Sequence, residues 1–353
     1  LRLCWRMLGR SAYPCLALLA TILASRGDEV AQRFHGACDA SAASALDARN
    51  FVVADDENNI LRIYSAAKPG MPLAEFPMGR FLKTNVDKHP EADLEACTRV
   101  GDRIYWIASH GRSKKGKWRP NRYLFFATDV VDEGDGKYRL DPCGRPSRAL
   151  LDVLLGLPRL DLRRSVGKIG ANAAGSLAPK EEGLNIEGLA ADPEGEVLYV
   201  ALRNPRPGGR ALLLPMLNAA AVVEQGERPR FGRPLRLDLG GRGVRSIEYS
   251  PPHGCYFLIG GSHEGERISA LYSWDGKEEG AVKILRRFGD LNPEAIALVP
   301  GTKRLRVLSD DGTVMYRVLP DESIEPLENG QCECKHLKDP RKKSFRSLEF
   351  DAE

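Results

Sequence analysis

The chain has 353 residues and a formal net charge of only +4, although 28% of its residues are charged. That balance is too weak to indicate binding to nucleic acid, which needs a concentrated basic surface. Hydrophobic residues make up 42% of the chain, and the 35 glycines and 23 prolines favour a turn-rich, all-β protein over a helical one.

The N-terminal segment predicts export from the cytoplasm. Arg2, Arg6 and Arg10 precede the apolar run SAYPCLALLATILAS, which is short for a helix that spans a membrane. A basic head followed by a short apolar core is typical of a secretory signal peptide, here over residues 1–25. We therefore expect a periplasmic or extracellular protein without further membrane contact. An uncleaved membrane anchor is the alternative.

Export would place the remaining cysteines in an oxidising compartment. Six cysteines follow the predicted signal peptide: Cys38, Cys97, Cys143, Cys255, Cys332 and Cys334. Disulfides among them are permitted, but the sequence does not decide the pairing. Their spacing does not match a zinc site with four ligands.

Four segments share one layout: residues 94–110, 186–203, 247–263 and 293–310. Each begins with a glutamate, turns at a glycine, and ends an apolar run on a polar residue 15 or 16 positions after the glutamate. Residues 38–56 are a weaker fifth copy. Two strands of about five residues joined by a short turn have this length, so each segment is predicted to be a β-hairpin.

Further strand-like runs follow each hairpin, and after the last hairpin they are TVMYRVL and SFRSLEF. Five groups of about four strands predict an all-β, five-bladed β-propeller that forms one domain over residues 34–353. The longest interval between the acids, 92 residues, contains SRALLDVLLGL with helical spacing. We expect an insertion with a short helix there, at about 145–183. A degenerate sixth blade, and thus a six-bladed propeller, is the alternative.

Four blocks carry a resemblance to a known family: CDASAASALDARNFVVADDENNILRIY, ADLEACTRVGDRIYWIASHGRSKKGKWRPNR, GLNIEGLAADPEGEVLYVALRNP and GGRGVRSIEY. They resemble a family of uncharacterised bacterial proteins, a domain of unknown function, across most of residues 34–350. That resemblance implies a propeller-like fold. The EGLA block also resembles secreted phytase-like esterase domains over a short stretch. Neither resemblance supplies a catalytic residue.

If the hairpins are the innermost strands, their first acids form a ring around the central channel. We predict a ring of Asp39, Glu95, Glu187, Glu248 and Glu294, with Asp93 on the same strand face as Glu95. Facing carboxylates raise each other's pKa and need partners. Three arrangements would provide them: ion pairs with residues such as Arg203 and Arg245, hydrogen bonds from backbone amides of the adjacent blade, or a bound Ca²⁺ or Mg²⁺ ion.

The far ends of the hairpins are predicted to lie at the same channel mouth. Their polar residues are Asp55, Asp56, His110, Arg203, His263, Asp310 and Asp311. The paired acids favour a cation site, although such pairs also occur in ordinary turns. His110 and His263 occupy the same place in two blades, so with nearby acids they are candidates for a mixed site.

A basic segment, SHGRSKKGKWRPNR, follows the second hairpin. Candidate anion-binding residues are Arg112, Lys114, Asn121, Arg122 and, from the later segment GGRGVR, Arg245. Arginine binds phosphate or carboxylate through two parallel hydrogen bonds, so this set suits an anionic ligand. A solvated hairpin tip is the alternative.

Two classes of function follow. The favoured one is an exported propeller that binds a small anionic ligand or a protein partner at the channel mouth. The other is a metal-assisted hydrolase of a phosphoester or similar anionic ester. No G-x-S-x-G nucleophile motif occurs. The sequence names no complete catalytic set, so enzymatic activity stays open.

Overall fold

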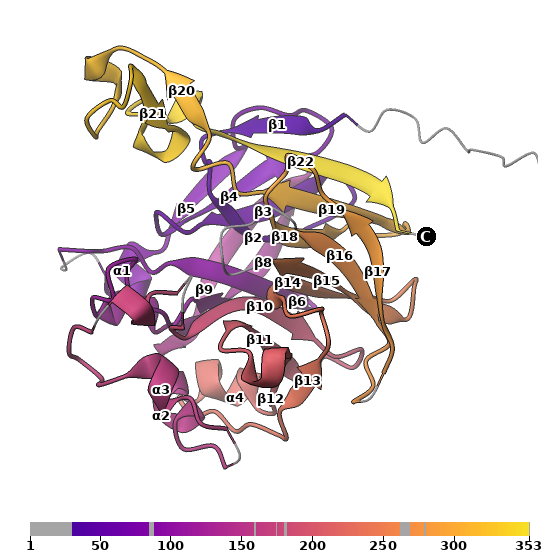
Figure 1. The fold of residues 1–353 in the computed structure, drawn as a ribbon. Helices are drawn as coiled ribbons and strands as arrows, with labels where there is room; N and C mark the ends of the chain where they lie inside the picture. Colours follow the sequence, from indigo (N-terminus) through magenta and orange to yellow (C-terminus); the bar gives the residue numbers. More distant parts are fainter. Residues whose placement is uncertain are drawn as a thin grey trace, which may run out of the picture.

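A computed structural model describes residues 30–84, 88–158, 160–173, 175–179, 182–261, 269–278 and 280–352. The predicted signal peptide and His263 lie outside these residues. The described chain forms five four-stranded antiparallel sheets (Figure 1). None of the helices in the described part is long and apolar enough to cross a membrane.

Each blade is numbered in chain order and given from its innermost strand outward. Blade 1 contains β2 (Ala40–Ala45), β3 (Asn50–Asp55), β4 (Ile60–Ser65) and β5 (Ala74–Pro77). Blade 2 contains β6 (Leu94–Val100), β7 (Arg103–Ala108), β8 (Phe125–Gly134) and β9 (Lys137–Ser147). Blade 3 contains β10 (Asn185–Ala191), β11 (Leu198–Asn204), β12 (Ala211–Met216) and β13 (Leu235–Leu237). Blade 4 contains β14 (Gly243–Ser250), β15 (Cys255–Gly261), β16 (Ala270–Trp274) and β17 (Val282–Arg287).

Blade 5 joins the two ends of the described chain. Its order is β18 (Pro293–Leu298), β19 (Arg304–Ser309), β22 (Ser344–Asp351) and, outermost, β1 (Gln32–His35). Phe34 of β1 is fully buried against Phe51, Tyr64 and Phe345, at ring-centroid distances of 5.2 to 5.6 Å. The N-terminal strand therefore closes the ring, because its removal would expose this aromatic cluster.

The innermost strands contact one another in the cyclic order β2, β6, β10, β14, β18 and back to β2. The five-bladed propeller is confirmed, and the six-bladed alternative is wrong. The long interval between β9 and β10 carries only short helices among its described residues: α2 (Leu150–Leu154), α3 (Arg163–Val166) and the 3₁₀ turn η2 (Gly175–Leu177). We call residues 148–184 the insertion.

The prediction for TVMYRVL is wrong. β20 (Met315–Arg317) pairs with β21 (Gln331–Glu333) in a separate two-stranded sheet, which stands off the ring in Figure 1. Met315 and Arg317 are exposed, so β20 lacks the apolar face that a blade strand buries. We call residues 312–343 the excursion. It includes the turns η4 (Pro320–Glu322), η5 (Cys334–His336) and η6 (Pro340–Lys342).

Four short elements complete the fold and lie in the loops of the blades: α1 (Gly79–Leu82), η1 (Pro120–Arg122), η3 (Pro207–Gly209) and α4 (Ala219–Glu224). The blades pack face to face through large buried side chains. Trp106 and Phe126 stack in blade 2, and Trp274 packs on Tyr256 in blade 4. These layers give the channel a rigid wall.

A β-bulge interrupts every innermost strand at one equivalent place. The hairpin register shifts at Ser41, Glu95, Glu187, Arg245 and Glu294. A bulge leaves one residue outside the ladder and re-aims its side chain. The bulges therefore define which residues are truly equivalent around the channel.

Candidate functional site

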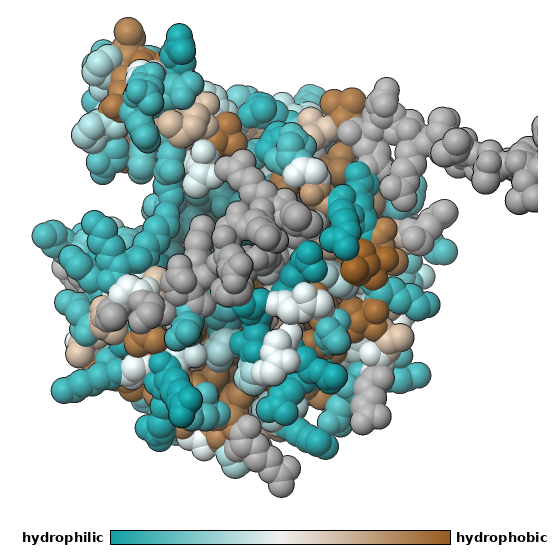
Figure 2. Space-filling model, viewed as in Figure 1, coloured by the Kyte–Doolittle hydropathy of each residue, from teal (hydrophilic) through white to brown (hydrophobic). Residues whose placement is uncertain are grey.

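A hollow of about 340 Å³ lies at the end of the channel where the innermost strands begin. Eight acidic and four basic side chains line it: Asp39, Asp56, Glu57, Asp93, Glu95, Glu187, Glu294 and Asp310, with Lys114, Arg122, Arg203 and Lys335. The insertion adds residues such as Pro179, and the excursion adds Thr313 and Lys335. Figure 2 shows largely hydrophilic side chains in the recess between the excursion and the ring. We call this hollow the mouth.

Two levels of side chains follow from the bulges. The lower level holds the bulged residues: Ser41, Glu95, Glu187, Arg245 and Glu294. The upper level lies two residues earlier in each blade: Asp39, Asp93, Asn185, Gly243 and Asn292. Asp39 thus belongs with Asp93 and not with Glu95, which corrects the predicted ring in blade 1.

The structure also corrects the position of Glu248. It lies three residues beyond the bulge and pairs with Phe257, so Arg245 occupies the ring position in blade 4. Glu248 lines a separate hollow with Ser44 and Arg99. Burial raises the pKa of Glu248 to about 8. The prediction matched Glu248 to the other ring glutamates by residue type, whereas its carboxylate lies toward the opposite end of the channel.

Blades 3 to 5 fill their half of the mouth with an ion network, which we call the paired half. Glu187 Oε1 accepts from Arg203 Nη1 at 2.6 Å and from Asn185 Nδ2 at 2.6 Å. Arg245 Nε lies 3.4 Å from Glu187 Oε2, and Arg245 also pairs with Glu294. Glu187 and Glu294 are therefore each compensated by a buried guanidinium.

In blades 1 and 2, Asp93 and Glu57 have cationic partners. Asp39, Asp56 and Glu95 make no ion pair within the described residues, and we call these three the unpaired half. Asp39 accepts only the thiol of Cys38, at 3.2 Å, among the side-chain bonds of the described residues. Asp56 Oδ1 is buried without a hydrogen-bond partner. Glu95 is 9% exposed and makes no ion pair within the described chain.

The electrostatics of the unpaired half reflect this lack of counter-charge. Burial, followed by repulsion from Asp310 and Asp55, raises the pKa of Asp39 to about 9. Burial and then the neighbouring acids raise the pKa of Asp56 and of Glu95 well above their usual range. A bound cation would lower these pKa values and favour the ionised carboxylates.

Asp93 lies beside the unpaired acids but has a cationic partner of its own. Its Oδ2 accepts from Arg122 Nη1 at 2.7 Å, and its φ of +57° is a left-handed conformation that aspartate tolerates better than most residues. One oxygen each from Asp56, Asp93 and Glu95 lie within 4.8 Å of one another, as do atoms of Asp39, Asp55 and Asp56. Three carboxylates thus converge on one point at the mouth.

Two lysines stand at the rim. Lys335 Nζ lies 3.0 Å from Glu57 Oε1, and Lys114 also lines the mouth. Burial lowers the pKa of Lys335, but the charge of Glu57 outweighs it and raises the value overall. This rim therefore keeps positive charge beside the unpaired acids.

Three residues predicted at the mouth serve the local fold. Asp55 accepts from the amides of Cys38 and Glu57, and Asp311 pairs with Arg346 at 2.8 Å. His110 is buried away from the mouth with Nδ1 2.9 Å from the Ala108 carbonyl, and burial lowers its pKa to about 4.

Some of the predicted anion-binding residues of the basic segment bond to nearby backbone carbonyls, and others line the mouth. Arg112 is buried and donates to the carbonyls of Val166, Lys168 and Ala171, so it anchors the insertion rather than an anion. Asn121 is buried and donates to the His89 carbonyl. Of this segment, Lys114 and Arg122 reach the mouth.

Hydroxyl groups, and not the ring glutamates, bond the blades to each other's backbone. Ser41 Oγ donates to the Leu94 carbonyl at 2.5 Å, while Thr98 and Ser246 accept from the amides of Ala191 and Ile296. None of the bonds of Glu95, Glu187 or Glu294 within the described residues is to a backbone amide. The ring glutamates therefore do not join the blades through backbone amides, although Glu187 and Glu294 join them through ion pairs with Arg245.

Sequence reasoning missed Asn185, Glu57 and Lys335. Asn185 belongs to a short recurring pattern: Asp or Asn, then any residue, then the bulge residue. The pattern occurs as DAS, DLE, NIE and NPE. Glu57 follows the acid pair at the end of β3. Lys335 carries no such signal, because it reaches the mouth from the excursion.

No family model matches the chain, and no curated protein matches it. The two resemblances found in the sequence therefore stay predictions, although the propeller-like fold implied by the first is the fold observed here.

Several solved structures show a low similarity to the chain. The glutaminyl cyclase of Myxococcus xanthus is 11% identical, with a TM-score of 0.42, over 79% of this chain and 88% of that one. A putative oxidoreductase (glucose dehydrogenase) of Thermus thermophilus is 12% identical, with a TM-score of 0.42, over 91% of this chain and 100% of that one. A Bacteroides thetaiotaomicron protein of unknown function is 9% identical, with a TM-score of 0.39, over 92% and 73%. At these scores the similarities indicate no activity.

Proposed function

We propose that the mouth binds one divalent cation through Asp56, Asp93 and Glu95, and through that cation a small anionic ligand. The observation that carries this proposal is the convergence of three carboxylate oxygens within 4.8 Å of one another. Oxygen ligands of this kind are those that calcium and magnesium prefer.

The residues fit a calcium ion. Calcium binds oxygens at about 2.3–2.6 Å, so two ligands on opposite sides of the ion lie at most about 5 Å apart. Magnesium, at about 2.0–2.1 Å, demands a nearly ideal octahedron and usually keeps several waters, so it suits a site of several protein oxygens less well. The unpartnered Oδ1 of Asp56 and the unpartnered, buried Oδ1 of Asn185 are further oxygen acceptors at the same mouth. We therefore favour calcium.

The rim supports an anionic ligand on the cation. Three protein carboxylates leave room in a coordination shell of six to eight oxygens. Lys114, Arg122 and Lys335 line the same hollow and offer donors to a phosphate or carboxylate. An anion alone would meet eight acidic side chains, so the cation is needed to reverse the local charge.

Hydrolysis of a phosphoester or similar anionic ester is the second candidate. When bound, a divalent cation polarises the ester oxygen. Asp39 lines the same hollow, where a bound cation favours its ionised form, and that carboxylate is the candidate to accept a proton from an attacking water. The same cation site would serve both candidates.

Calorimetric titration tests the proposal. We expect calcium to bind the purified protein with a stoichiometry of one, and E95Q to weaken binding by at least about ten-fold, since it removes one charged ligand. The matched control is E248Q, which alters a half-buried glutamate at the other end of the channel and should bind as the wild type does. Absence of calcium and magnesium binding to the wild type would refute the proposal.

A second titration addresses the ligand. With calcium present, inorganic phosphate and a dicarboxylate such as malonate are added to the wild type and to E95Q. We expect binding to require calcium and to be lost in E95Q. A screen of phosphomonoesters then separates binding from hydrolysis. Phosphate binding that is equally strong in the presence of a chelator would contradict the bridging role of the cation.

A further inference from the structure

The excursion meets blade 1 through a pair of cysteines. Cys38 immediately precedes β2, and Cys334 begins the turn η5; both are fully buried, at 1% and 0% exposure. Both side chains belong to one small buried cluster, together with Cys332 and Leu337. The two residues are nearly three hundred positions apart in sequence, so this contact joins distant parts of the chain.

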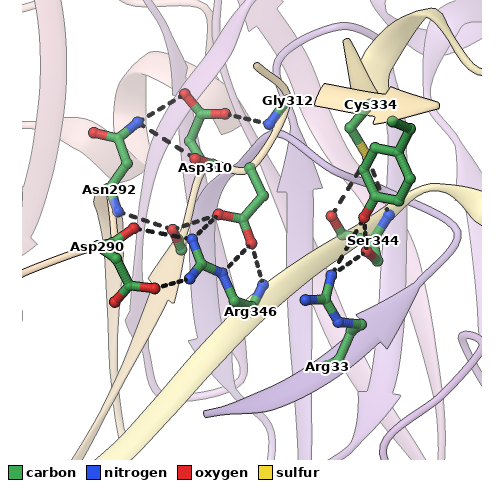
Figure 3. Close-up of polar contacts among 11 residues, drawn as sticks. Arg33, Asp290, Asn292, Asp310, Gly312, Cys334, Ser344 and Arg346 are labelled. Atoms are coloured by element: carbon green, nitrogen blue, oxygen red, sulfur yellow. Dashed lines mark hydrogen bonds and ion pairs between the residues drawn. The ribbon is translucent and has the colours of Figure 1, made fainter. Parts of the chain in front are cut away.

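Backbone hydrogen bonds fix both cysteines to the start of the excursion and the residue before it. The Cys38 carbonyl accepts from the Asp311 amide at 2.8 Å, and the Cys334 amide donates to the Val314 carbonyl at 2.8 Å. The Cys334 sulfur also accepts from the Ser344 amide at 3.4 Å, as Figure 3 shows. These bonds fix where each sulfur lies without involving any other cysteine.

The other cysteines are placed differently. Cys97 and Cys143 belong to the cores between other blades, and Cys255 packs against a third. Cys332 shares the small cluster with Cys38 and Cys334, but it lies on β21 opposite Tyr316. Of the three cysteines in this cluster, Cys38 and Cys334 are the two that directly precede residues of the mouth, Asp39 and Lys335.

We propose that Cys38 and Cys334 oxidise to a disulfide that fastens the excursion to the rim of the mouth. The oxidant is a second disulfide, either of a small thiol or of a thiol-disulfide oxidoreductase. One cysteine sulfur attacks it and releases one thiolate; the other cysteine then attacks the mixed disulfide and releases the second thiolate. The two cysteine protons go to the two leaving thiolates, so two thiols of the oxidant form for each protein disulfide.

The asymmetry of the pair indicates which sulfur attacks first. The interaction with Cys38 lowers the pKa of Cys334, whereas the same interaction, followed by burial, raises the pKa of Cys38. Cys334 therefore provides the first thiolate. Both sulfurs are inaccessible in the docked state, so the reaction requires the excursion to lift or takes place before it docks.

The consequence is local to the rim. Cys334 precedes Lys335, which pairs with Glu57, and Cys38 precedes Asp39, whose carboxylate its thiol contacts. The disulfide therefore holds the rim lysine and an unpaired acid in fixed positions, and it limits opening of the excursion. The disulfide does not depend on cation binding.

Peptide mapping under non-reducing conditions tests the link. Full-length protein is incubated with oxidised glutathione, alkylated, and cut with trypsin and a glutamate-specific protease, which separates Cys332 from Cys334 at Glu333. We expect a peptide of residues 34–49 joined to one that contains Cys334, two hydrogens lighter than the separate peptides, and lost on reduction. A link that involves Cys332, or free thiols at both positions, would overturn the proposal.

Limited proteolysis provides a second readout. In the oxidised wild type, trypsin should cut the excursion at least about ten-fold more slowly than in the reduced protein, because the link suppresses local opening. C332S is the matched control and should keep both the link and the protection, whereas C334S should lose both. Equal cleavage of oxidised and reduced wild type would contradict the fastening role.

Discussion

The paired and unpaired halves of the mouth differ in the counter-charges that their acids receive. Glu95, Glu187 and Glu294 occupy the same bulge position on the innermost strands, yet only the last two have a guanidinium partner. In blades 3 to 5, Arg245 replaces a glutamate and compensates both Glu187 and Glu294. In blades 1 and 2, no guanidinium reaches Asp39, Asp56 or Glu95 within the described residues. The presence of an arginine at the bulge of blade 4 therefore provides ion pairs for the neighbouring glutamates, whereas the acids of blades 1 and 2 are left to bind a cation.

The comparison also separates stability from function. A buried ion pair is costly to break, because one charge is left without compensation. An unpaired buried carboxylate lowers stability instead and persists in a protein when it serves another purpose. We therefore expect substitutions in the two halves to change different properties.

The largest effect should come from the paired half. R245M removes the cation between Glu187 and Glu294, and we expect it to lower the free energy of unfolding by about 3–5 kcal/mol. Urea unfolding of the purified variant measures this change. R317M is the matched control, because Arg317 is exposed on the excursion. A loss no larger than that of R317M would mean that the network does not hold the ring together.

In the unpaired half, E95Q should abolish the cation response. Calcium at about 100 times its dissociation constant should stabilise the wild type by about 2.7 kcal/mol. We expect less than half of that gain in E95Q and in D56N, measured as the calcium-dependent shift in melting temperature. In the presence of a chelator, E95Q should be at least as stable as the wild type, since it replaces a buried carboxyl that has no ion pair by a neutral side chain of the same shape. Strong destabilisation of cation-free E95Q would place Glu95 with the paired acids.

Stability should depend on pH in a direction set by the unpaired half. The pKa of Asp39 rises from 3.8 to about 9 on folding, so its contribution to stability is fully present below pH 3.8 and is lost as the pH approaches 9. We expect the melting temperature of the chelated protein to fall between pH 5.5 and pH 8.5, and saturating calcium to reduce this fall. A pH dependence that calcium leaves unchanged would contradict the link between cation and carboxylates.

The smallest effect should come from the rim. K335M removes a partly solvated ion pair with Glu57, and we expect it to cost less than about 1 kcal/mol of stability. It should weaken the binding of phosphate in the presence of calcium while leaving calcium binding alone within about two-fold. An unchanged phosphate affinity would remove Lys335 from the ligand site.

The fold could be predicted because its signal is repeated. Five hairpins with a constant spacing between polar ends require equivalent surroundings, and a ring of blades provides them. The closure by β1 could not be predicted in the same way, since four residues carry too little pattern. TVMYRVL was misplaced because its alternation resembles a blade strand, although its side chains remain exposed in the excursion.

The site could be predicted only in part. Glu187 and Arg203 were expected at one end of a hairpin, and they lie 2.6 Å apart there. Glu248 was misplaced because the alignment followed residue type, whereas equivalence is set by the bulge, where blade 4 carries Arg245. Arg112 was misassigned because its carbonyl acceptors lie in the insertion, far along the chain. Such contacts between loops leave no periodic trace in a sequence.

The position of the ion itself tests the central claim most directly. Crystals grown with manganese, which gives an anomalous signal and takes oxygen ligands, should show one peak at the mouth of the channel. We predict that it lies within about 2.6 Å of carboxylate oxygens of Asp56, Asp93 and Glu95, and that E95Q crystals lack it. A wild-type crystal without a peak there, or with its peak among other residues, would contradict the account.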